Sequence, residues 1–151
     1  MHMRDILRYG DHTYRLRQRL AQPLCEEFDV SCKEIDILSF LCNNPELNTA
    51  RDITEHLKIA KSNLSPLLVH LEKAGWLRAE PEQGNRRLKR LILLRERGKE
   101  LARLTEYQES FMDIFTRGFT DKELETMHIL LERMDANVLK ALAELEEKKH
   151  A

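Results

Sequence analysis

The sequence predicts a mainly α-helical (α+β) fold in which one two-stranded hairpin interrupts a series of amphipathic helices. The chain of 151 residues has only 5 Gly and 4 Pro and is 34% charged, a composition typical of helices. Apolar residues recur at helical spacing over most of its length. Residues 76–94 lack that spacing and contain a polar Gly-Asn turn. The length favours one compact domain.

The first two helices are predicted from apolar spacing and from a cap. Residues 4–28 repeat apolar side chains at helical intervals, with arginines between them. A second helix begins at Ser31, because the sequence Ser31-Cys32-Lys33-Glu34 fits a capping box in which hydroxyl and carboxylate satisfy free backbone donors. The run Asn43-Asn44-Pro45 ends it.

Two shorter helices are predicted next, over residues 49–57 and 61–74, with residues 58–60 as the turn between them. Gly75 ends the second of these helices as the residue after its C-cap. Pro66 lies inside it and removes one backbone hydrogen bond. Either the first turn of this helix is tilted or the helix begins later.

A β-hairpin and two long helices complete the chain. Residues 76–80 and 86–94 form two extended runs on either side of the turn Gly84-Asn85. Helical spacing resumes over residues 96–118. A second capping box, Thr120-Asp121-Lys122-Glu123, opens the last helix.

A helix pair followed at once by a hairpin is the arrangement of a winged helix-turn-helix. The second helix of such a pair fits the DNA major groove when its outward face carries hydrogen-bonding side chains. Here that face offers Lys61, Ser62, Asn63, Ser65 and His70. A polar outward face is also the default for any surface helix.

The hairpin carries the stronger indication, because charge is concentrated there. Between Gly84 and Lys99 seven cations and one anion give +6, whereas the whole chain has a net charge of −1. Residues 119–149 hold eight acids and five bases, or −3, which indicates that the last helix does not face nucleic acid. Cations on an edge strand also protect against aggregation. After a helix-turn-helix pattern, however, double-stranded DNA is the favoured partner.

This ordered set of elements resembles the MarR family of bacterial transcription regulators over nearly the whole chain. The resemblance is strongest in the helix pair, R-D-I-T-E-H-L at 51–57 and N-L-S-P-L-L-V-H-L-E-K-A-G-W-L at 63–77. The run L-R-E-R-G at 94–98 is similar to the family's L-T-x-x-G segment. The run L-S-P-L-L at 64–68 is similar to the branch that includes peroxide-sensing and staphylococcal regulators.

The wing departs from the family's pattern, which carries an Asp before its arginine. Asn85-Arg86-Arg87 stands there instead, and the distance to Gly98 is one residue longer than usual. A β-bulge or a longer tip would absorb the extra residue. We expect Asn85, Arg86 and Arg87 to contact phosphate or the minor groove, with Arg86 or Arg87 entering the groove.

The resemblance implies a homodimeric repressor that binds a pseudo-palindromic operator. Residues 1–30 and 96–151 would supply the dimerisation helices, and residues 31–95 would form the DNA-binding region. In the family, small aromatic acids or phenols bind between the dimer and DNA-binding parts and release the DNA, so a small aromatic effector is the expected ligand.

Two alternatives stay open. One is a thiol-based redox-sensing regulator that uses Cys25 or Cys32, since Cys32 lies near a helix N-terminus, where the helix dipole stabilises a thiolate. Buried or idle thiols are the competing interpretation. The other is a winged-helix protein-interaction module without DNA binding, which the missing wing Asp favours.

Several classes of function find no support in the sequence. There is no G-x-S-x-G motif and no Gly-rich phosphate loop, so we expect no enzyme. The six histidines lack metal-ligand spacing, so neither a metal site nor a cofactor is expected. No apolar run approaches the ~20 residues of a membrane helix. No signal peptide is recognisable at the N-terminus, and a cytoplasmic protein without membrane contact is expected.

Overall fold

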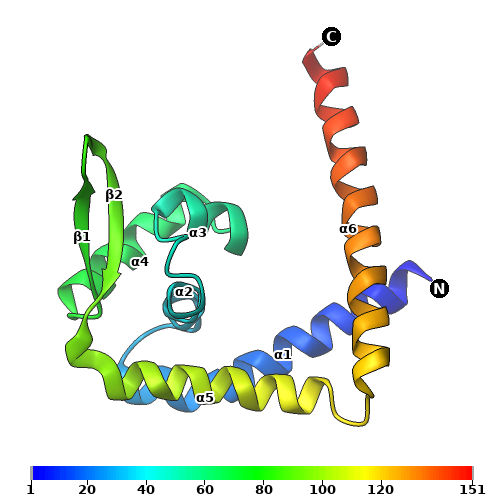
Figure 1. The fold of residues 1–151 in the computed structure, drawn as a ribbon, viewed down its shortest axis with the longest axis horizontal. Coiled ribbons are helices and arrows are strands. Elements are labelled where there is room, and N and C mark those ends of the chain that lie inside the picture. The colour runs from blue at the N-terminus through cyan, green and yellow to red at the C-terminus, as the bar shows by residue number, and fades with distance from the viewer. Residues whose placement is uncertain (1, 151) are drawn as a thin grey trace. The chain divides into compact units, whose positions relative to one another are not determined.

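The chain divides into two compact units, residues 1–112 and residues 113–151, in a computed structural model that describes residues 2–150. The second unit holds the end of α5 and the long helix α6 (Asp121–His150). The first unit holds the remaining elements (Figure 1), which are α1 (Met3–Phe28), α2 (Cys32–Asn43), α3 (Ala50–Leu57), α4 (Lys61–Lys73), β1 (Leu77–Glu82), β2 (Asn85–Leu93), a 3-10 turn (Arg95–Arg97) and most of α5 (Gly98–Phe115). The predicted mainly α-helical winged fold with a two-stranded wing is confirmed.

Both predicted capping boxes form. At the start of α2, the Glu34 amide donates to the Ser31 hydroxyl at 3.3 Å, and the Ser31 amide donates to the Glu34 carboxylate at 2.7 Å. Thr120 and Glu123 make the same reciprocal pair before α6. A third box, which was not predicted, joins Thr49 to Asp52 at the start of α3. Each box satisfies amides that a helix N-terminus leaves free.

The structure decides between the two alternatives at Pro66, and it shifts the bounds of α5 and of both strands. Helix α4 begins at Lys61 and continues through Pro66, so the later start is wrong. Helix α5 begins at Gly98 rather than at residue 96, because residues 95–97 form the 3-10 turn, and it ends at Phe115. Gly118 has a φ of +86°, a left-handed conformation that glycine adopts without strain and that interrupts helix geometry before α6.

The core of the first unit surrounds α2. Figure 1 views α2 nearly along its axis, with α3 and α4 on one side and α1 and α5 on the other. Ile35, Ile37 and Leu38 of α2 are fully buried. So are Leu64 and Leu71, which lie one above the other on the inner face of α4. This inner face fixes which side of α4 points outward. Among the described residues, no helix is both long and apolar enough to cross a membrane.

Candidate nucleic-acid interface

The outward face of α4 is polar at its N-terminal end. Lys61, Ser62, Asn63 and Ser65 are all exposed, as the sequence predicts. The Ser65 hydroxyl donates to the Lys61 carbonyl at 3.3 Å, and Val69 extends the face with a side chain that is 48% exposed. Val69 was missed at the sequence level, because an apolar residue in a helix is normally assigned to the core. A methyl-bearing side chain on this face suits contact with thymine.

His70 is exposed on α4 but already has a partner inside the protein. Its Nδ1 donates to Oε1 of Glu34 at 2.5 Å, and the Glu34 side chain is only 4% exposed. The other Glu34 oxygen accepts from the Ser31 amide and the Ser31 hydroxyl. His70 therefore joins α4 to the N-terminus of α2, and only its Nε2 remains for a DNA contact.

The wing tip contains a break in strand register, as the extra residue before Gly98 predicts. Strands β1 and β2 pair in antiparallel register up to Pro81 opposite Lys89, and then Glu82 pairs with Asn85. Residues 86–88 of β2, which include Arg86 and Arg87, therefore have no partner residue on β1. Both arginine side chains are exposed and form no ion pair with another described residue. The Asn85 side chain instead accepts from the Arg87 amide at 3.2 Å, so it shapes the tip.

Two arginines of the cationic segment, Arg90 and Arg97, have hydrogen-bond partners inside the protein. Arg90 donates to Glu82 across the hairpin and to Asn48 at 3.1 Å, where the Leu91 amide also donates to the Asn48 carbonyl at 2.7 Å. These contacts attach the wing to the segment before α3. The remaining positive charge of the wing is concentrated at its tip.

Arg97 fixes the other end of the wing. Its guanidinium donates to the Ala74 carbonyl at 2.7 Å and to the Gly75 carbonyl at 3.3 Å, which are free groups at the C-terminus of α4. It also lies 4.6 Å from the ring centroid of Trp76, which is buried. Trp76 thus packs at the corner between α4 and β1, as predicted.

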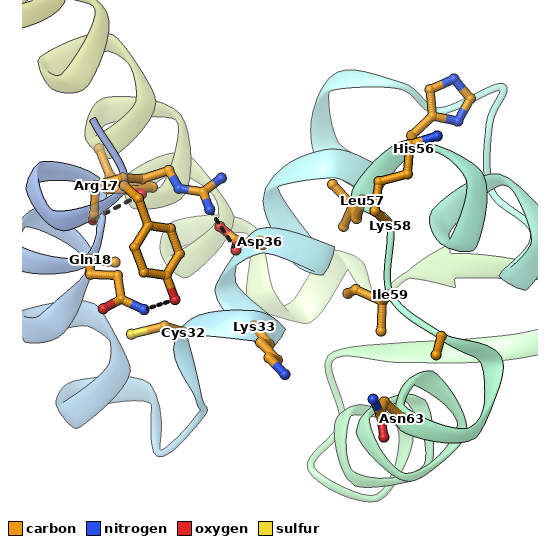
Figure 2. Close-up of a pocket in the computed structure, with 14 residues that line it drawn as sticks. Arg17, Gln18, Cys32, Lys33, Asp36, His56, Leu57, Lys58, Ile59 and Asn63 are labelled. Carbon is orange, nitrogen blue, oxygen red and sulfur yellow. Dashed lines mark hydrogen bonds and ion pairs between the residues drawn. The ribbon is translucent and has the colours of Figure 1, made fainter. Parts of the chain in front are cut away.

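A cavity of about 460 Å³ lies behind the interface, between α1 and α2 on one side and the turn before α4 on the other. Figure 2 shows Arg17 turned toward Asp36, with Asn63 and Ile59 on the far side. The Arg17 guanidinium and the Asp36 carboxylate are 3.3 Å apart. Burial raises the pKa of Asp36, and the Arg17 charge partly offsets that rise. No sequence signal singled out these residues, because they are far apart in the chain.

Tyr107 of α5 closes one wall of the same cavity. Its hydroxyl donates to the Arg17 carbonyl at 3.3 Å, and burial raises its pKa to about 12. The lining therefore combines aromatic surface with one guanidinium in a space of the size that small ligands occupy.

The two cysteines considered as a redox site lie together. The sulfurs of Cys25, in the last turns of α1, and of Cys32, the first residue of α2, are 3.1 Å apart. Both are partly buried, and Cys32 lines the cavity. In the part of the chain that the structure describes, no group of three or more His, Cys, Asp or Glu side chains is placed to hold a metal ion.

Comparisons with known proteins agree with this arrangement. A MarR family model matches residues 28–88, which span α2 to β2. The HTH-type transcriptional regulator PecS of Dickeya dadantii is 30% identical over 127 residues, which cover 82% of this chain and 76% of PecS. The uncharacterized HTH-type transcriptional regulator YybA of Bacillus subtilis is 25% identical over 137 residues, or 90% of each chain.

Solved structures share the fold. A putative MarR family regulator from Listeria monocytogenes, solved in complex with 26mer DNA, matches with a TM-score of 0.77 at 17% identity, covering 97% of this chain and 95% of its own. A MarR protein from Peptoclostridium difficile matches with a TM-score of 0.74 at 22% identity, covering 89% and 87%. Together with the match to PecS, these findings show that the chain belongs to the MarR family of transcriptional regulators.

Proposed function

We propose that the protein is a sequence-specific DNA-binding repressor that binds a pseudo-palindromic operator as a homodimer and is released by a small aromatic ligand. Members of its family are transcriptional regulators and not enzymes. The observation that carries the proposal is the pairing of an exposed polar face on α4 with two unpartnered arginines, Arg86 and Arg87, on the adjoining wing. Such a pair offers base contacts from a helix and phosphate or minor-groove contacts from a hairpin.

Unpartnered apolar surface supports the homodimer. On α6, described by itself, Leu131, Met134, Val138, Leu142 and Leu145 are each between 43% and 57% exposed and follow helical spacing. A continuous apolar stripe of this kind requires a partner surface. Residues 1–30 and 96–151 are accordingly the dimerisation helices of the proposal, and residues 31–95 are its DNA-binding region.

Footprinting and sedimentation test the DNA-binding and dimer parts together. The protein should sediment as a dimer and protect two half-sites about 10 base pairs apart, centre to centre, on a duplex selected from a random pool. A reporter placed behind that duplex should be repressed. If binding to mixed duplex DNA showed no dependence on salt, the interpretation as a protein-interaction module would replace this one.

The cavity is the proposed effector site. An aromatic acid would place its ring against Tyr107 and its carboxylate on Arg17, in competition with Asp36. Calorimetry with benzoate and with phenol tests this, and Gln18→Trp, which fills part of the cavity, should abolish the binding. Gln22→Trp, one turn further along the same helix at an exposed position that does not line the cavity, is the matched control. Equal binding by both variants would remove the cavity as the site.

A further inference from the structure

The middle of the exposed face of α4 carries an apolar pair, Pro66 and Val69. Leu64 and Leu71 are the buried residues of this helix, and each member of the pair lies two residues from one of them. Two residues turn an α-helix by about 200°, so Pro66 and Val69 point almost directly away from the core. Both are exposed, and Val69 keeps 48% of its surface. The pair is therefore presented to whatever α4 contacts.

Three polar side chains that flank the apolar pair already have hydrogen-bond partners inside the protein. On one flank, His70 is bonded to Glu34 at 2.5 Å. On the other flank, the Ser65 hydroxyl donates to a backbone carbonyl of the same helix at 3.3 Å, and the Glu72 carboxylate accepts from a backbone amide of β1 at 3.2 Å. Fewer polar groups are thus available for base edges than the sequence of α4 suggests, and the apolar pair is left as a main contact surface.

The charges around the apolar pair favour nucleic acid over an apolar protein partner. Lys73 lies one turn beyond Val69 on the same exposed stripe, and Lys61 begins the helix. The wing, whose strand β1 packs against α4, adds the exposed Arg86 and Arg87. Cations around the pair suit a polyanion. The major groove of DNA combines flanking phosphates with one apolar group on its bases, the C5-methyl of a pyrimidine.

We propose that Pro66 and Val69 determine part of the DNA specificity by contacting the C5-methyl group of a pyrimidine, which thymine and 5-methylcytosine share. Side chains three residues apart on a helix are about 5–6 Å apart, so a methyl group seated between them contacts both. The contact removes apolar surface from water on both partners, which favours a methylated base over its unmethylated counterpart. This inference rests on the proposed function, because it names what the DNA-binding face reads.

Anisotropy titrations test the contact with a duplex that the unsubstituted protein selects from a random pool. A second copy of the duplex carries deoxyuridine in place of thymidine, which removes the methyl groups and keeps every base-pairing group. A third copy carries 5-methylcytosine in place of cytosine. Burial of one methyl-sized group contributes about fourfold in affinity, or about 15-fold when both half-sites of the proposed homodimer lose it. A loss of this size with deoxyuridine identifies thymine as the source, and a gain of this size with 5-methylcytosine identifies methylated cytosine.

Pro66→Ala combined with Val69→Ala should bind the methylated and the unmethylated duplex with affinities that no longer differ. Alanine favours a helix more than either residue, and both positions are exposed, so this variant should fold. Lys73→Ala is the matched control on the same stripe. It should weaken binding to both duplexes alike and keep the full ratio between them.

The outcomes separate this inference from the proposed function. If the protein binds its selected duplex and the deoxyuridine and 5-methylcytosine copies equally well, the methyl contact is overturned and sequence-specific binding stands. A methyl dependence that persists in the double variant would overturn the assignment to Pro66 and Val69. If the protein selects no duplex at all, the proposed function fails, and this inference fails with it.

Discussion

Replacing the two arginines of the wing tip separates DNA contact from folding. In Arg86→Ala combined with Arg87→Ala, the two lost side chains are exposed and form no ion pair with a described residue. They occupy a segment without a cross-strand partner, so no ladder pairing depends on them. The free energy of unfolding should therefore change by no more than about 0.5 kcal/mol.

The expected effect on DNA binding follows from counterion release. Each phosphate contact contributes about 0.9 to the slope of log binding constant against log salt concentration. With two arginines on each subunit of the proposed homodimer, the double substitution should reduce the slope by about 3.6 and weaken binding to all duplex sequences alike. Because phosphate contacts carry little sequence information, the ratio of the affinities for two duplex sequences should change much less than either affinity.

Fluorescence anisotropy of a labelled duplex, titrated at several salt concentrations, measures the slope. The matched control is Arg133→Ala combined with Lys140→Ala, which removes the same charge from exposed positions on α6. Its slope should equal that of the unsubstituted protein. The reasoning fails if the wing variant keeps its full slope, or if the control loses as much. A collapse of thermal stability in the wing variant would instead show that the tip supports the fold.

Three further outcomes concern the fold and its pH dependence. Arg97→Met should lower the free energy of unfolding by about 2 kcal/mol, because α4 loses two donors at its C-terminus, whereas exposed Arg95→Met should not; urea unfolding compares them. Glu34→Gln should cost about 1–3 kcal/mol in the same assay, because a buried acceptor of three hydrogen bonds gains an unmatched donor. The pKa of Asp36 is higher in the folded protein than in the unfolded chain, so protonation of this carboxyl stabilises the folded state at low pH. This contribution to the free energy of unfolding is lost as pH rises through the folded-state pKa. Asp36→Asn should remove that fall from the stability profile, and an unchanged profile would contradict the assignment.

Local features of the fold were predictable from the sequence because their causes are local. The Ser31–Glu34 and Thr120–Glu123 boxes form between residues three apart, so four letters of sequence contain both partners. Gly75 ends α4 because its φ of +74° is a left-handed backbone conformation that glycine adopts without strain. The bulged wing tip was also foreseeable, since the extra residue before Gly98 had to be accommodated within one hairpin.

The pairings of long side chains were not predictable, because their partners lie far away in the sequence. Counting charge from Gly84 to Lys99 treats all cations alike, yet Arg90 pairs with Glu82 and Arg97 caps α4. The same limit applies to His70, which was predicted to contact DNA and whose ring is hydrogen-bonded to buried Glu34. Periodicity identifies which face of a helix is polar. It does not identify which polar groups the protein itself uses.

The N-terminus of α2 lies between the cavity of the proposed ligand and helix α4. Cys32 and Asp36 line the cavity on this helix, and Glu34 between them faces α4. Because these residues are closely spaced on one helix, we expect a displacement of the cavity wall to reach His70 through Glu34. The buried carboxylate of Glu34, which caps α2, thus also positions α4, the helix that we propose to contact DNA.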